Sequence, residues 1–95
     1  MRTVWKYALP VQDEIIEVEM PKGAEILHVD TQREQVCLWA LVESEQEKEI
    51  RRFRIHGTGH PLANNAGTGY NTYDTYVGTS IHLDGMLVWH VFEVK

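Results

Sequence analysis

The most constraining feature of the sequence is an unbroken apolar run at residues 36–42, which reads Val-Cys-Leu-Trp-Ala-Leu-Val. The run is too short to span a membrane as a helix, because that requires about 20 apolar residues. The run is apolar at both alternating sets of positions. This pattern and the length of the run are typical of a central strand covered on both faces. It therefore predicts a β-rich domain built around a buried strand.

Six further segments carry the pattern or the β-forming residues of strands: 3–9, 14–20, 24–31, 50–56, 76–83 and 86–94. Pro21-Lys22-Gly23 predicts a turn, and the charged segment 43–49 is interpreted as a hairpin loop. Asp84-Gly85 predicts a type I′ hairpin turn between the last two strands. The chain is thus expected to form one domain, 1–95, that is all-β, a small antiparallel barrel or sandwich of about seven strands with one long loop.

The composition narrows the range of functions and cellular locations that we expect for the protein. The formal net charge is −5 at pH 7, which disfavours a general nucleic-acid binder because phosphate affinity comes mostly from clustered Lys and Arg. Cys37 is the only cysteine, so no intrachain disulfide can form, which fits a reducing cytoplasm. No apolar run could span a bilayer and the N-terminus lacks the pattern of a signal peptide, so we expect a cytoplasmic protein without membrane contact.

Catalytic and metal chemistry find little support in the sequence. Cys37 lies within the most apolar strand, where burial makes a thiol inert. Neither serine lies in a nucleophile motif. Among the histidines only His56 and His60 are close in sequence, and a strand-to-loop break separates them. We expect no enzyme activity, no metal and no cofactor.

The candidate binding site begins on the strand 50–56. Alternation places Phe53 and Ile55 inward and puts Arg52, Arg54 and His56 on the opposite face. Two arginines on one strand face suit bidentate contacts to phosphate or carboxylate. On this interpretation Arg54→Ala weakens binding and leaves the melting temperature nearly unchanged. The alternative is a solvated basic face with no ligand.

The loop that follows extends the site. Gly57, Thr58 and Gly59 can turn successive backbone N–H groups toward an anion, and His60 could orient that anion. The segment is no P-loop, because the Lys-Ser/Thr pair is missing. The alternative interpretation is an ordinary tight turn.

Three tyrosines recur at every third residue from the long loop into the next strand: Tyr70, Tyr73 and Tyr76. A tyrosine ring offers a flat stacking face and a polar tip, which suits a base or another aromatic ligand. The alternative is that these rings anchor the loop to the core.

The last strand, 86–94, is apolar on both faces. A core this small can cover one face, so the second predicts a homo-oligomer. The alternative is that a long loop covers it.

Four stretches resemble a family of small uncharacterised phage and prophage proteins: Met-Pro-Lys-Gly-Ala at 20–24 with Ile-Leu at 26–27, Cys-Leu-Trp-Ala-Leu-Val at 37–42, Phe-Arg-Ile-His-Gly-Thr-Gly-His-Pro at 53–61 and Trp-His-Val-Phe-Glu at 89–93. The resemblance covers nearly the whole chain. It implies a phage-encoded protein that acts inside a bacterial host cell, and it carries over no catalytic residues.

Together these observations predict a non-catalytic binding module for a small anionic, nucleotide-derived ligand. In a phage context such a module would be an oligomeric sponge that sequesters an immune signal of the host. The alternatives are a protein-protein interaction module that inhibits a host protein, and a minor structural component of the phage.

Overall fold

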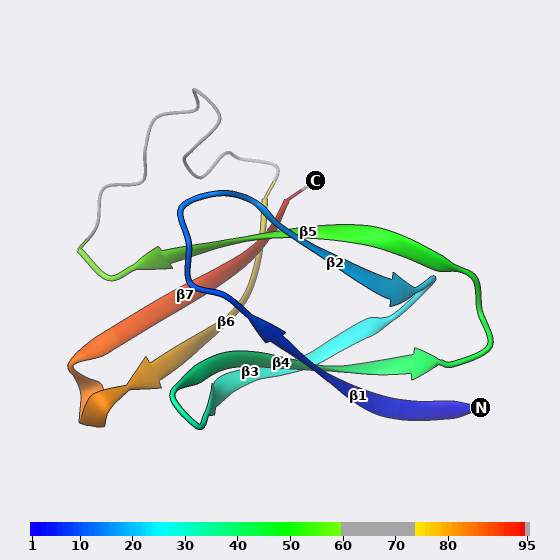
Figure 1. The fold of residues 1–95 in the computed structure, drawn as a ribbon, viewed down its shortest axis with the longest axis horizontal. Coiled ribbons are helices and arrows are strands. Elements are labelled where there is room, and N and C mark those ends of the chain that lie inside the picture. Colours follow the sequence, from blue (N-terminus) through cyan, green and yellow to red (C-terminus); the bar gives the residue numbers. More distant parts are fainter. Residues whose placement is uncertain (60–73, 95) are drawn as a thin grey trace.

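The computed structural model of the chain describes residues 1–59 and 74–94. In these residues seven antiparallel strands form two sheets (Figure 1). Sheet A has the order β1 (Arg2–Leu9), β4 (Gln35–Glu43), β3 (Glu25–Gln32). Sheet B has the order β2 (Ile16–Pro21), β5 (Lys48–Gly57), β7 (Leu87–Val94), β6 (Thr75–His82), and the short turn η1 (Leu83–Gly85) joins β6 to β7.

The predicted all-β architecture is confirmed. The two sheets pack against each other as a sandwich and do not close into a barrel. Each predicted strand is present, with bounds that differ by up to two residues from those expected. The side chains between the sheets form one core, which includes Leu9, Met20, Val29, Val36, Leu38, Val42, Phe53, Ile55 and Val91.

The apolar run is confirmed as the centre of sheet A, because β4 pairs with β1 on one side and β3 on the other. The prediction that both of its faces are covered is wrong. One face packs on the core, whereas Trp39 and Leu41 on the other face are only half-buried. No described element packs over this outer face of sheet A. Cys37 lies on it and is nevertheless only 2% exposed.

The segment 43–49 is not a hairpin loop, so that prediction is also wrong. It carries the chain from β4 in sheet A to β5 in sheet B, where β5 pairs with β2 and β7. The β2–β3 turn crosses between the sheets beside it, and the Lys22 N–H donates to the Glu47 carbonyl at 2.8 Å. The composition of a loop predicts that the chain changes direction. It does not indicate which sheet the next strand will join.

At one corner of the sandwich β3 lies beside β6, although the two strands belong to different sheets. Thr31 Oγ1 lies 2.6 Å from Ser80 Oγ and donates to the Ile81 carbonyl at 2.7 Å. Next to these contacts the backbone of Gly78 faces Val29, with no room for a side chain. Small and hydroxyl-bearing residues thus let the two sheets meet at this corner.

Two hairpin turns need left-handed backbone. Asp84 has φ 53° and ψ 33° and Gly85 has φ 96°, as the predicted type I′ turn requires. Arg33 and Glu34 join β3 to β4 with φ of 52° and 64°. Both are side-chain-bearing residues in a conformation that favours glycine and asparagine, and the sequence carries no turn signal there.

None of the helical structure in the described residues is long and apolar enough to cross a membrane.

Candidate functional site

The register of sheet B decides which side chains share its outer face. Phe53 and Ile55 are buried against the core, so Arg52, Arg54 and His56 project from the opposite face, as predicted. On the neighbouring strand β7, Phe92 lies level with Arg54, and His90 lies level with His56. On β6, Tyr76 lies level with Phe92.

One ring on this face contacts two others. Phe92 lies edge-on to His56 and to Tyr76, with ring centroids 5.6 Å apart in each case. These are favourable aromatic geometries. Tyr76 is 57% exposed, so its ring offers a free surface beside the other two.

A chain of hydrogen bonds runs through the same face. Thr58 Oγ1 lies 2.5 Å from His90 Nε2, and Thr79 Oγ1 lies 3.1 Å from His90 Nδ1. The Tyr76 hydroxyl contacts Thr79 Oγ1 in turn. A neutral imidazole accepts one such bond and donates the other, so both ring nitrogens of His90 are engaged. We name these residues the outer-face cluster: His56, Thr58, Tyr76, Thr79, His90 and Phe92.

Arg54 is buried on this face, so the alternative of a solvated basic face is wrong for this residue. The residue is only 6% exposed, and its Nε lies 3.9 Å from Oδ2 of Asp74, whose side chain is fully buried. The distance is too long for a hydrogen bond, so the attraction between these two groups is Coulombic. Asp74 therefore offsets the charge that Arg54 would otherwise offer to a phosphate.

The surroundings of His56 favour its neutral form. Burial lowers the pKa of His56 from its ordinary value of 6.5, and the nearby positive charge of Arg54 lowers it further, while Asp74 opposes the shift. A neutral imidazole can accept a hydrogen bond, and it adds no positive charge to the site. The outer-face cluster contains no Asp, Glu, Lys or Arg, and its side chains are polar or aromatic.

Arg52 is the cation of the predicted site that remains in solvent. Its Nε lies 3.3 Å from Glu17 Oε2 across the β2–β5 pair, and both side chains are more than half exposed. Exposed ion pairs of this kind contribute about 0–1 kcal/mol, so an anionic ligand can replace the carboxylate at little cost.

The predicted anion nest is partly occupied by the protein itself. Gly57 continues β5 and pairs with Trp89, and the Thr58 N–H donates to the Val88 carbonyl at 3.0 Å. Gly59 has φ 82° and follows in the turn. His60, Tyr70 and Tyr73 lie outside the described residues.

A cavity of about 320 Å³ opens where β5 ends and β7 begins. Thr58 lines it together with Met86, Leu87 and Trp89. Its volume is at the lower end of the range of small-molecule sites, about 300–1,000 Å³, and its lining combines apolar side chains with one hydroxyl. Because Thr58 also bonds His90, the cavity adjoins the outer-face cluster.

Of the predicted site residues that the structure describes, five side chains thus lie together on one sheet face: Arg52, Arg54, His56, Thr58 and Tyr76. The residues that the prediction missed are Asp74, Thr79, His90 and Phe92. A signal existed for one pair, because a two-residue turn at Asp84-Gly85 sets Thr79 opposite His90. The pairing of β7 with β5, which adds His56 and Thr58, has no comparable local signal.

The Thr58–His90 contact places a hydroxyl against a potential base, the first element of a nucleophilic dyad. The second nitrogen of His90 meets the hydroxyl of Thr79, where a catalytic dyad is usually oriented by a carboxylate. Among residues 1–59 and 74–94, no group of three or more His, Cys, Asp or Glu side chains could hold a metal ion. The described side chains of the outer-face cluster offer stacking and hydrogen bonding.

Comparison with known proteins adds a family. Residues 1–95 match the family described as Domain of unknown function (DUF7352). The chain belongs to this family. No curated protein and no solved structure matched the chain.

Proposed function

We propose that this DUF7352 protein is a non-catalytic binding module for a small anionic, nucleotide-derived ligand, encoded by a phage or prophage and acting in the cytoplasm of the bacterial host. Its role would be to sequester an immune signal. The observation that carries the proposal is the exposed ring of Tyr76 beside Phe92, His56 and His90, on the same sheet face as the exposed Arg52.

The rings suit the base of such a ligand. A base stacked on an aromatic side chain contributes about 1–3 kcal/mol. Tyr76 is the ring with a free face, and the neutral His56 and the Thr79 and Thr58 hydroxyls can meet polar edges of a base. The adjoining cavity beside Trp89 supplies further apolar surface.

Arg52 suits the anionic part. It lies four residues before His56 on the extended strand β5, which is about 13 Å along the strand. A nucleotide-derived ligand separates its base from its phosphates by a sugar, and can therefore contact both regions at once. The charge of Arg54 is offset by Asp74, so Arg54 would help to position the neighbouring side chains and would not bind the phosphate as proposed from the sequence.

Native mass spectrometry with a panel of cyclic oligonucleotides and ADP-ribose derivatives tests the proposal. We expect one panel member to add its mass to the protein and to be released unaltered on denaturation. Tyr76→Ala should then weaken binding about 5–150-fold, the equivalent of about 1–3 kcal/mol. Arg52→Ala should weaken it about tenfold or more, since a hydrogen bond to a charged group contributes about 1.5–3 kcal/mol.

Arg33→Ala is the matched control, because it removes the same charge from an exposed turn between β3 and β4, away from the cluster. It should leave binding unchanged. A protein that gains no panel mass, or a ligand whose affinity ignores both Tyr76→Ala and Arg52→Ala, would contradict the proposed site.

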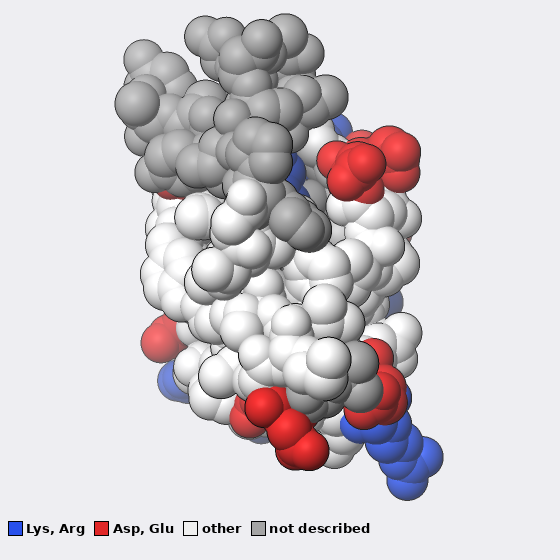
Figure 2. Space-filling view, turned by 90° about the vertical axis from the view of Figure 1, so that its left-hand side faces the viewer, with Lys and Arg blue, Asp and Glu red and all other residues white. Residues whose placement is uncertain are grey.

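A second candidate is a protein-protein interaction module that inhibits a host protein. The observation that favours it is the β6–β7 hairpin, where Ile81 and Leu87 are exposed and Met86 is 81% exposed. Figure 2 views the molecule from the end that carries this hairpin, and the middle of the surface in that view is free of charged side chains. A stoichiometric partner in pull-downs from infected cells, lost with Met86→Glu and kept with Tyr76→Ala, would support this function over ligand binding.

A further inference from the structure

The outer face of sheet A, on the opposite side of the sandwich from the outer-face cluster, has its own pattern. Its side chains follow from the register. Val4 lies level with Leu41 and Glu25, and Lys6 lies level with Trp39 and His28. Arg2 lies level with Glu43 at one end, and Ala8 lies level with Cys37 and Asp30 at the other. Opposed residues in a sheet share a face, so these side chains form one surface.

The middle of this surface is apolar. Trp39 and Leu41 on β4 are half-buried, and Val4 on β1 is 49% exposed. Leu27, which lies at the irregularity in the β3–β4 pairing, is also 49% exposed. No described strand or turn covers them. An apolar strip on the central strand is the kind of surface that a partner usually covers.

The charges on the two sides of the strip have opposite sign. β1 contributes Arg2 and Lys6, whereas β3 contributes Glu25 and Asp30. Lys6 Nζ donates to the Gln32 side chain at 2.6 Å, and Asp30 lies 3.4 Å from the His28 ring nitrogen. Within residues 1–59 and 74–94, neither Arg2 nor Lys6 forms an ion pair with an acidic side chain. The surface is therefore positive along one edge and negative along the other.

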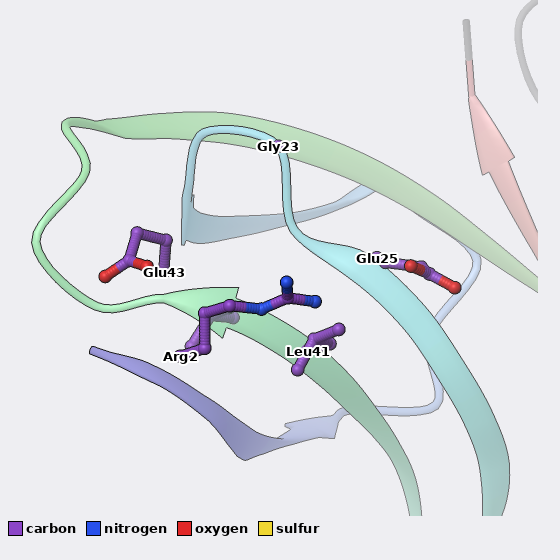
Figure 3. A pocket seen from close by; sticks show the side chains of 6 residues that line it. Arg2, Gly23, Glu25, Leu41 and Glu43 are labelled. Carbon is purple, nitrogen blue, oxygen red and sulfur yellow. The ribbon is translucent and has the colours of Figure 1, made fainter.

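A hollow at the Arg2 end belongs to the same surface. A cavity of about 260 Å³ is lined by Arg2, Gly23, Glu25, Leu41, Val42 and Glu43. In Figure 3 the guanidinium of Arg2 extends over Leu41 and lies between Glu43 and Glu25. The hollow gives the surface relief that a partner's side chain can fill.

This arrangement is self-complementary. A two-fold axis running parallel to β4, between two facing copies, turns the second copy so that its β1 lies over the first copy's β3. The basic edge of each copy then meets the acidic edge of the other, twice by symmetry, and the two apolar strips meet in the middle. A two-fold axis across the strands would instead oppose like charges.

We propose that the outer face of sheet A is a homodimer interface, formed by two copies packed face to face about an axis parallel to β4. The inference is independent of the ligand site, which lies on sheet B. It places the oligomer contact on β4 and its neighbours rather than on the last strand, where the sequence suggested it. A three-stranded face is small beside the roughly 800 Å² per partner of a standard interface, so the dimer should dissociate readily and weaken at high salt.

Sedimentation velocity of the full chain and two charge-reversed variants tests the interface. The first variant combines Arg2→Glu with Lys6→Glu, and the second combines Glu25→Lys with Asp30→Lys. Each variant alone brings like charges together and should be monomeric under conditions in which the unmodified chain is a dimer. An equimolar mixture of the two should dimerise again, because each reversed edge then meets its opposite charge.

The matched control combines Lys48→Glu with Arg52→Glu, which makes the same charge change on β5 of the other sheet and should leave the dimer intact. Circular dichroism confirms that each variant is folded. An unmodified chain that sediments as a monomer overturns the proposal. So does an oligomer that both variants leave intact, or a pair of monomeric, folded variants whose mixture stays monomeric.

Discussion

Gly78→Ala tests the corner at which the two sheets meet. A Cβ added at Gly78 would lie 2.7 Å from Cβ of Val29 and 2.9 Å from its Cγ2. Carbon atoms in favourable contact lie about 3.5–4.0 Å apart, so β6 and β3 would have to separate by about 1 Å. The Cβ of Val29 is bonded directly to the backbone of β3, and no rotamer change can move it away. The strain must therefore fall on the backbone.

The size of the effect follows from two opposing contributions. Overpacking a well-packed site costs about 1–3 kcal/mol. Alanine also reduces the entropy of the unfolded chain relative to glycine, which offsets about 0.4–1 kcal/mol. We expect the free energy of unfolding of Gly78→Ala to fall by about 1–2 kcal/mol. For a domain of 95 residues this lowers the melting temperature by about 4–16 °C.

Urea unfolding followed by tryptophan fluorescence measures the loss, and a double-mutant cycle with Val29→Ala shows its origin. Val29→Ala removes Cγ2, so in the Gly78→Ala background it should relieve part of the strain, with a coupling of about 0.5 kcal/mol or more. The Cβ contact remains, and the rescue should be partial. A Gly78→Ala protein as stable as the unmodified chain, or two changes that simply add, would refute the close approach of β3 and β6.

Three further predictions concern charge, backbone and pH. Arg54→Ala should lower the free energy of unfolding, measured in urea, by about 3–5 kcal/mol, because it leaves the Asp74 carboxylate buried without its counter-ion. Adding Asp74→Ala should restore part of this loss. An unchanged stability would mean that Arg54 is solvated, the alternative considered from the sequence. Arg33→Asn combined with Glu34→Gly should raise the stability by about 1–2 kcal/mol in calorimetry, since both positions have positive φ; a lower melting temperature would contradict that turn geometry. Burial lowers the pKa of His56 below its ordinary 6.5, so the unfolded chain takes up a proton that the folded chain resists, and stability should fall as the pH drops below 6.5. In melting curves against pH, His56→Gln should flatten this fall, and an identical pH profile would mean that His56 titrates alike in both states.

Local patterns were sufficient for the strands themselves. Alternation in β2 and β5 places Ile16, Met20, Phe53 and Ile55 in the core, because a half-buried strand needs apolar side chains at every second position. The type I′ turn could also be predicted from the sequence, since Asp-Gly is a dipeptide that tolerates two consecutive left-handed residues well. That turn even sets the Thr79–His90 pair of the outer-face cluster.

By itself, then, the sequence determined where the strands lie and which side chains alternate toward the core, because these depend on neighbours a few residues apart. The tertiary structure alone decided that 43–49 crosses between sheets, that β5 lies between β2 and β7, and that Arg54 is buried beside Asp74. Those outcomes depend on pairings between strands far apart in the chain, which no local pattern encodes. The burial of a charged side chain follows the same rule, because it is set by what packs over its face and by the counter-ion that the fold brings to it.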